Sequence, residues 1–203
     1  MTYERKDAHY RRAKAEGFRA RSAYKLAELD DRHRVLRKGD RVVDLGAWPG
    51  GWCQVALERV GPGGRVVGVD LVPLDPLPAK NLTLLVGDLR DSSIAEQLTS
   101  PLGGPADVVL SDAAPKLTGI RDQDEARCSE LVSAILGLLP RILKPGGRLL
   151  LKLFMDGDHK DRMASLSRSF DDVKATRPEA SRRSSAELYA IARGFRGHPQ
   201  GCG

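Results

Sequence analysis

The chain has 203 residues, of which 41% are hydrophobic and 30% are charged, a composition typical of one soluble globular domain. No apolar run approaches the roughly 18 residues of a membrane span, and the first residues lack the apolar segment of a signal peptide. The three cysteines are scattered and form no Cys-x-x-Cys pair, which disfavours a disulfide framework and a zinc site. We therefore expect a cytoplasmic protein that holds no metal.

The net charge of +6 is unevenly placed. Residues 1–25 carry eight Lys and Arg against three acids, residues 174–203 carry six against two, and the segment between them has a net charge of −3. Basic ends on a nearly neutral body indicate an electrostatic footprint for a polyanion such as nucleic acid. Charge alone leaves a second interpretation open, because basic termini are often only solvated arms.

Apolar runs and helical patterns alternate through most of the chain after a basic arm over residues 1–17. Apolar residues recur at helical spacing from Ala23 to Leu29, which predicts the first helix. Glycine and proline clusters separate the later elements. The predicted helices cover 22–34, 51–60, 92–98, 123–143 and 161–170. The predicted strands cover 41–45, 65–70, 82–86, 107–112, 148–154, 173–176 and 186–192.

This alternation predicts an α/β fold with a mostly parallel, doubly wound sheet. No helix separates the last two strands, which should be joined by a basic loop, so we expect one antiparallel edge strand. We expect a single domain over residues 18–196, followed by a flexible tail at 197–203.

A glycine loop follows the first predicted strand and opens the next helix. Gly46, Gly50 and Gly51 have no Cβ atom, so the backbone there can turn sharply and lie against a ligand. The spacing differs from the Gly-x-Gly-x-x-Gly of dinucleotide folds, and no Gly-Lys-Ser/Thr follows for a triphosphate. A tight turn without a ligand is the alternative interpretation.

Acidic residues recur where apolar strands meet their loops. Asp44, Asp70, Asp88 and Asp112 all occupy such positions, and the ligand crevice of an open α/β sheet lies outside the carboxyl ends of its strands. Several acids there could accept hydrogen bonds from ribose hydroxyls and an exocyclic amine, which suits an adenosine without phosphates. Each acid by itself could equally be a helix N-cap.

Lys152 lies within an apolar run that should be buried on both faces of the sheet. Lysine is almost never fully buried unless it is paired. The residue is therefore either one half of a structural salt bridge or a site residue at the end of the sheet, near Asp112.

Five segments occur in a characteristic order: 19–26 (RARSAYKL), 44–52 (DLGAWPGGW), 111–115 (SDAAP), 152–154 (KLF) and 185–189 (SAELY). Together they resemble the FtsJ/RrmJ (RlmE) family of S-adenosylmethionine-dependent ribosomal RNA 2′-O-ribose methyltransferases, over about residues 15–196. The glycine loop alone is shared by many methyltransferases. Far more specific is the set Lys25, Asp112, Lys152 and Glu187, which matches the Lys-Asp-Lys-Glu tetrad of 2′-O-methyltransferases.

The resemblance implies a Rossmann-like class I methyltransferase fold and S-adenosyl-L-methionine as cofactor. Gly46, Gly50 and Trp52 would line the loop side of the cofactor, with the last two at its methionine end. Asp70 would hold the ribose hydroxyls and Asp88 the adenine amine. Trp48 departs from the family pattern, which usually has a small residue there.

The resemblance also implies the roles of the tetrad. Asp112 would lie near the cofactor's amino group and the transferred methyl, and Lys152 would accept the proton of the ribose hydroxyl. Lys25 and Glu187 would position the lysine and the substrate. Burial beside a second cation favours a neutral Lys152, whereas the two carboxylates favour its ammonium, so the sequence leaves open whether it acts as a base or as a cation.

The implied substrate is a uridine of large-subunit ribosomal RNA, within a 50S particle late in assembly, methylated by a monomer. The basic arm and a loop with Arg182 and Arg183 would grip phosphates beside the cofactor crevice. Three other functions stay open. They are a transfer RNA 2′-O-methyltransferase, a non-catalytic ribosome-assembly factor on the same fold, and a dinucleotide oxidoreductase, which the glycine spacing disfavours.

Overall fold

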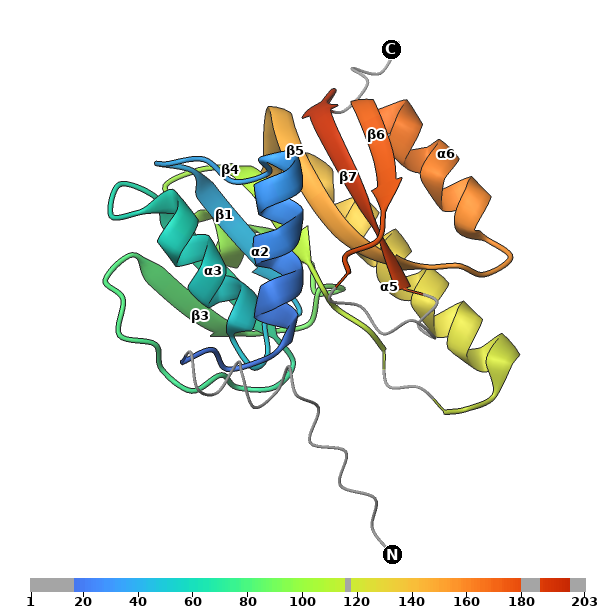
Figure 1. Ribbon diagram of the computed structural model, residues 1–203, viewed down its shortest axis with the longest axis horizontal. Helices are drawn as coiled ribbons and strands as arrows, with labels where there is room; N and C mark the ends of the chain where they lie inside the picture. The colour runs from blue at the N-terminus through green and yellow to red at the C-terminus, as the bar shows by residue number, and fades with distance from the viewer. Residues whose placement is uncertain (1–16, 116–117, 180–186, 198–203) are drawn as a thin grey trace, which may run out of the picture.

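The computed structural model describes residues 17–115, 118–179 and 187–197. Its helices and strands alternate over most of that length (Figure 1). The helices are α2 (Ser22–His33), α3 (Gly51–Val60), α4 (Ile94–Thr99), α5 (Arg121–Ile142) and α6 (His159–Ser169). The strands are β1 (Arg41–Leu45), β2 (Arg65–Asp70), β3 (Leu82–Val86), β4 (Ala106–Ser111), β5 (Leu143–Phe154), β6 (Phe170–Thr176) and β7 (Glu187–Phe195).

The strands form one seven-stranded sheet in the order β3-β2-β1-β4-β5-β7-β6. Strands β1 to β5 pair in parallel, and β7 runs antiparallel to both of its neighbours. The chain order reverses between β1 and β4, which places a topological switch point at the carboxyl ends of those two strands. The predicted α/β fold with a mostly parallel sheet is confirmed.

Helices cover both faces of the sheet, so two cores form (Figure 1). Successive residues of a strand point to opposite faces. Along β5, Leu149, Leu151 and Leu153 therefore join the core under α4, α5 and α6, whereas Leu150 joins the core under α2 and α3. Lys152 falls on the second of these faces, two positions beyond Leu150, and this alternation points it toward α2.

The reversed strand is β7, which lies inside the sheet, so that β6 forms the edge. A second difference is at β5, which begins at Leu143 directly after α5, although residues 144–147 contain the Pro-Gly-Gly turn that predicted a break. Ala106 pairs with Leu143 and Val108 with Arg148, so the turn is accommodated as a register shift rather than as a separate loop. None of the described helices is long and apolar enough to cross a bilayer.

Candidate active site

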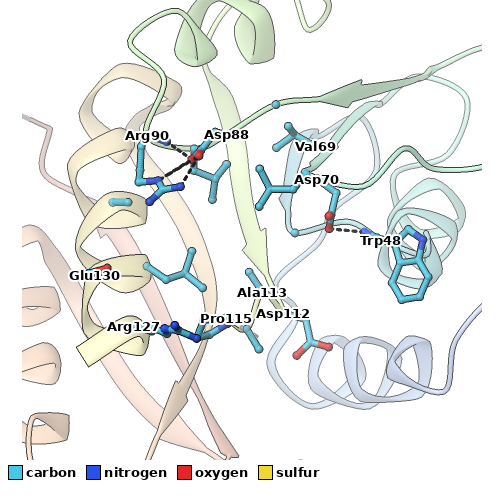
Figure 2. A pocket seen from close by; sticks show the side chains of 17 residues that line it. Trp48, Val69, Asp70, Asp88, Arg90, Asp112, Ala113, Pro115, Arg127 and Glu130 are labelled. Atoms are coloured by element: carbon cyan, nitrogen blue, oxygen red, sulfur yellow. Dashed lines mark hydrogen bonds and ion pairs between the residues drawn. The ribbon is translucent and has the colours of Figure 1, made fainter. Parts of the chain in front are cut away.

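A cavity of about 570 Å³ opens at the carboxyl ends of β1, β2, β3 and β4, a size suited to a small-molecule ligand (Figure 2). Three of the four strand-end acids line it, each from a different strand or its following loop: Asp70, Asp88 and Asp112. Residues Leu131 and Ala134 of α5 and Leu89 give one part of the lining an apolar character. The cavity therefore combines separated carboxylates with an apolar wall.

Gly46 forms the floor of the cavity where two strand-end loops meet. Its φ of 78° lies in the left-handed region, and a Cβ at this position would lie 2.5 Å from the Cβ of Ala113. Only glycine lets the loop after β1 lie directly against the loop after β4. This close approach brings Asp112, the neighbour of Ala113, to the same cavity as Asp70.

Asp70 is the last residue of β2, and the backbone holds its carboxylate from two sides. Oδ2 accepts a hydrogen bond from Trp48 N at 2.9 Å, and Oδ1 accepts one from Val72 N at 3.0 Å. Each carboxylate oxygen can accept a second hydrogen bond. Asp70 is therefore a fixed acceptor that still has room for two hydroxyl donors of a ligand.

Asp88 lies two residues beyond β3, and Arg90 engages both of its oxygens (Figure 2). Arg90 Nε lies 2.9 Å from Oδ1 and a terminal nitrogen lies 2.5 Å from Oδ2. Side-chain and backbone hydrogen bonds from Arg90 lower the pKa of Asp88 to about 2. The carboxylate is thus kept as a pure acceptor, the form required to receive an amine.

Asp112 follows β4. It lines the cavity and also contacts buried residues behind it. Tyr189 donates its hydroxyl to Asp112 Oδ1 at 2.6 Å. Lys152 Nζ donates to the Asp112 backbone oxygen at 2.6 Å and lies 3.2 Å from Oδ1. The lysine side chain is only 6% exposed, so its charge is accommodated by this one acid.

A second ion pair lies beside the first. Lys25 Nζ, from α2, is 2.8 Å from Glu187 Oε2 at the start of β7. The same ammonium lies 5.8 Å from the ring centroid of Tyr189, whose hydroxyl reaches Asp112. The structure therefore brings all four tetrad residues together as two Lys–acid pairs on either side of one tyrosine.

Asp44, the remaining strand-end acid, lies behind the cavity and not in its lining. It is one residue short of the end of β1, 1% exposed, and it faces α3, where Cys53 Sγ donates to its Oδ2 at 3.3 Å. Its Oδ1 has no hydrogen-bond partner among the described residues. Burial, followed by the charges of Asp112 and Asp70, raises the pKa of Asp44 to about 7.

Two residues expected at the cofactor are also outside the cavity lining. Trp52 is 3% exposed, its ring packs on Tyr189 with centroids 6.0 Å apart, and its Nε1 donates to the Ser22 carbonyl at 2.8 Å. Gly50 caps α3 with a φ of 108°, and a Cβ there would lie 3.2 Å from the side chain of Arg19. The two residues fix the start of α3, Trp52 against the first residue of α2 and Gly50 against Arg19 just before it.

Family comparison agrees with this architecture. The model of the FtsJ-like methyltransferase family matches residues 18–195. The chain belongs to the FtsJ-like methyltransferase family. Its seven-stranded sheet, with the antiparallel strand β7 between β5 and β6, has the class I methyltransferase arrangement.

Several curated relatives match nearly all of this chain. A protein of Methanothrix thermoacetophila named ribosomal RNA large subunit methyltransferase E is 48% identical, over 95% of this chain and 74% of its own length. The protein of the same name from Methanothermobacter thermautotrophicus is 45% identical, over 95% of this chain and 92% of its own length.

Two solved structures are also similar. One, from Plasmodium falciparum, is described as a ribosomal RNA methyltransferase, and it is 29% identical with a TM-score of 0.78, covering 89% of this chain and all of that one. Fibrillarin of Aeropyrum pernix, solved with S-adenosyl-L-methionine natively bound, is 16% identical with a TM-score of 0.56. It covers 78% of this chain and 68% of its own, and at that identity it supports the fold alone.

Tyr189 and Arg90 are site residues that the sequence did not single out. Glu187 and Tyr189 are two positions apart on β7, so strand alternation places both on one face, opposite Phe154 and Lys152 of β5. That spacing was a usable signal for Tyr189. Arg90 follows Asp88 by two residues, but an exposed arginine in a loop gives no comparable signal. The basic arm and the loop with Arg182 and Arg183 lie outside the described residues.

Proposed function

We propose that this chain transfers a methyl group from S-adenosyl-L-methionine to the 2′-hydroxyl of a uridine ribose in large-subunit ribosomal RNA. One observation carries the assignment. A nearly buried lysine reaches a carboxylate at the mouth of a ligand-sized cavity, and a second lysine–carboxylate pair lies beside it. Family membership and the names of the relatives support the substrate class.

The cavity residues fit the cofactor when its parts are placed one by one. Asp88 and the apolar wall of Leu89 and Leu131 suit an adenine, whose amine is a donor and whose ring is flat and apolar. Asp70, next along the cavity, suits the ribose hydroxyls. Asp112 then falls to the methionine end, where a carboxylate would favour both the ammonium and the positively charged sulfonium.

The cofactor supplies an activated methyl group, so the protein's task is to align the ribose oxygen with it and accept a proton. The carbon–sulfur bond breaks, its electron pair stays on sulfur, and the methyl carbon bonds to the ribose oxygen. The proton of that hydroxyl goes to Lys152 Nζ, which must first lose the extra proton of its ammonium form. Asp112, which accepts a hydrogen bond from Tyr189, holds this lysine, and the Lys25–Glu187 pair positions the hydroxyl.

Both lysine–carboxylate pairs of the site are formed within a single chain, which supports action as a monomer. We propose that the substrate is the assembled large subunit in the cytoplasm, gripped by the basic arm and by the loop with Arg182 and Arg183. Residues 18–196 would form the methyltransferase domain. RNA affinity should then fall steeply as salt rises, because each phosphate contact releases counterions.

The test uses purified chain, labelled S-adenosyl-L-methionine and large ribosomal subunits from cells that lack this enzyme. We expect one 2′-O-methyluridine per particle, found by mass spectrometry and confirmed by resistance of the adjacent phosphodiester to alkali. Asp112→Ala should abolish labelling, since it removes both the acid at the cavity and the partner of Lys152. Asp171→Ala changes an exposed acid of edge strand β6 and should label at the wild-type rate.

Parallel incubations separate the alternatives. Naked ribosomal RNA should be a poorer substrate than the particle, and a transfer RNA pool should stay unlabelled. Labelling of transfer RNA alone would reassign the substrate. An absence of labelling on every RNA, despite cofactor binding, would favour a non-catalytic assembly factor and reject the proposal.

A further inference from the structure

The unused feature of the site is the exposed ring of Trp48. Its side chain is 57% exposed, and it lines the same cavity as Asp112. Within the described residues its ring makes no hydrogen bond and no contact with another ring, whereas Trp52 is buried against Tyr189. A large aromatic group left exposed beside a ligand-sized cavity adds nothing to the core and is available to a ligand.

The backbone beneath this ring is firmly held. Trp48 N donates to Asp70 Oδ2, and Asp70 Oδ1 accepts from Val72 N. Arg19 donates to the carbonyl of Pro49 at 3.4 Å and to the carbonyls of Asp75 and Pro76 at 2.5 and 2.6 Å. The ring is therefore presented by a fixed loop, which lowers the entropy cost of using it for binding.

The neighbours of Trp48 extend the apolar surface. Leu71 is 67% exposed and Val72 is 48% exposed, and both follow the acid that holds Trp48. We call Trp48, Leu71 and Val72 the apolar rim. Arg19 and Ala20 pack against the loop and the start of α3, so the loop that carries Trp48 lies beside the segment leading into α2, the helix that carries Lys25.

Figure 2 shows Trp48 apart from the part of the cavity assigned to adenine. Asp88 and Arg90 lie on one side of the cavity, Trp48 lies on the other, and Asp70 is between them. A nucleoside with its ribose at Asp70 and its amine at Asp88 directs its base away from the indole. The cofactor thus leaves the ring of Trp48 uncovered.

We propose that Trp48 is a stacking platform for a base of the RNA substrate, adjacent to the nucleotide that is methylated. The proposal rests on the proposed RNA 2′-O-methyltransferase function. An RNA strand that presents one ribose at Asp112 must pass its neighbouring nucleotides over the mouth of the cavity. Aromatic faces accept any base, so this contact would strengthen binding without selecting sequence.

The chain contains two tryptophans, one exposed and one buried, so fluorescence can report the contact directly. The probes are a 12-nucleotide single-stranded RNA of mixed sequence, the same length of abasic RNA, and S-adenosylhomocysteine. We expect quenching by the first probe only. In Trp48→Phe the remaining signal comes from Trp52 and should not respond.

Steady-state methylation of large subunits supplies the second readout. Trp48→Leu removes the aromatic face but keeps an apolar group, and it should raise the KM for RNA by about five- to 150-fold, the range for one base–aromatic stack. Trp48→Phe should stay near the wild-type value. The Kd for S-adenosylhomocysteine should be the same in all three proteins.

The outcomes distinguish the stacking proposal from the RNA 2′-O-methyltransferase function on which it rests. Quenching by S-adenosylhomocysteine alone, or a weaker cofactor Kd in Trp48→Leu, would make the indole a cofactor cover and overturn the proposal. Equal quenching by abasic RNA, or an unchanged KM in Trp48→Leu, would also overturn it. A wild-type protein that methylates no RNA would instead refute the proposed function.

Discussion

Asp44 and Asp88 belong to the same sheet and follow the same kind of apolar run, yet they occupy opposite environments. Asp44 is enclosed behind the cavity, where a thiol is its one hydrogen-bond donor among the described residues, and its pKa rises to about 7. Asp88 lies on the open side, held by the guanidinium of Arg90, and its pKa falls to about 2. Position at a strand end therefore does not determine the charge of an acid; burial and partners do.

The difference divides the site into a closed region and an open one. The closed region holds Asp44 and the Lys152–Asp112 pair, where charge persists only beside a partner. The open region holds Asp88 and Arg90, where water competes with the ion pair. Substitutions in the closed region should therefore have the larger effects.

The largest effect is expected at Lys152. Lys152→Ala should lower the single-turnover rate of methyl transfer by about 10² to 10⁴-fold, the usual contribution of a positioned acid or base. Lys152→Arg keeps a cation that does not give up its proton, so it should lose nearly as much activity if the lysine is the proton acceptor. Quench-flow measurements with saturating S-adenosyl-L-methionine provide the rates.

The pH dependence sharpens this test. If Lys152 accepts the proton, the wild-type rate should increase with pH, since an ammonium cannot accept one, and this increase should be absent in Lys152→Ala. A flat wild-type profile together with an active Lys152→Arg would contradict proton transfer. Lys152 would then be a cation that only orients the hydroxyl.

The second effect is on stability and concerns Asp44. Because its pKa is raised in the folded protein, folding takes up a proton between pH 3.8 and about 7. Its contribution to stability is complete below that window and is lost as pH rises through it. At about 1.36 kcal/mol per pKa unit, the free energy of unfolding relative to Asp44→Asn should fall by about 4 kcal/mol.

Urea denaturation at pH 4, 5.5 and 8 measures this difference. Asp88→Asn is the matched control, because a lowered pKa gives a contribution that is present above pH 3.8 and lost only as pH falls toward 2. The difference in free energy of unfolding between Asp88→Asn and wild type should therefore be the same at pH 5.5 and pH 8. An equally level difference for Asp44→Asn would mean that Asp44 stays solvated in the native protein.

Most of the fold was predictable because the strands are short apolar runs bounded by glycine, proline or acids. The bounds of β1, α3, β2 and β3 agree with the predicted ones, and the family resemblance is confirmed. The position of β7 between β5 and β6 was not predictable, because the antiparallel pairing of Lys152 with Tyr189 joins residues far apart in sequence. Local patterns carry no information on such a pairing.

The site was harder to predict than the fold for a related reason. Asp44 and Asp70 look alike in sequence, but Asp44 pairs with Gly68, two positions before Asp70, so Asp44 faces Cys53 whereas Asp70 reaches the cavity. Trp52 looks like a ligand-lining residue at the start of a helix, yet its ring closes the core against Tyr189. Burial depends on which helix packs over each strand end, which a linear pattern does not specify.

The smallest effect is expected at Arg90, in the open region. The carboxylate of Asp88 is 38% exposed while Arg90 is bound, so the arginine orients the acid without closing it off from the cavity. Arg90→Ala should raise the Kd for S-adenosylhomocysteine at pH 7 by less than about tenfold, as expected for an exposed ion pair. Arg90→Lys keeps the charge but loses the paired hydrogen bonds of the guanidinium, so its Kd should fall between the values of wild type and Arg90→Ala.

Calorimetry at pH 7 and pH 4.5 measures these Kd values. The difference in Kd between Arg90→Ala and wild type should widen at the lower pH, because only the paired Asp88 keeps its lowered pKa. Tighter binding in Arg90→Ala would show instead that the arginine competes with the adenine amine for Asp88.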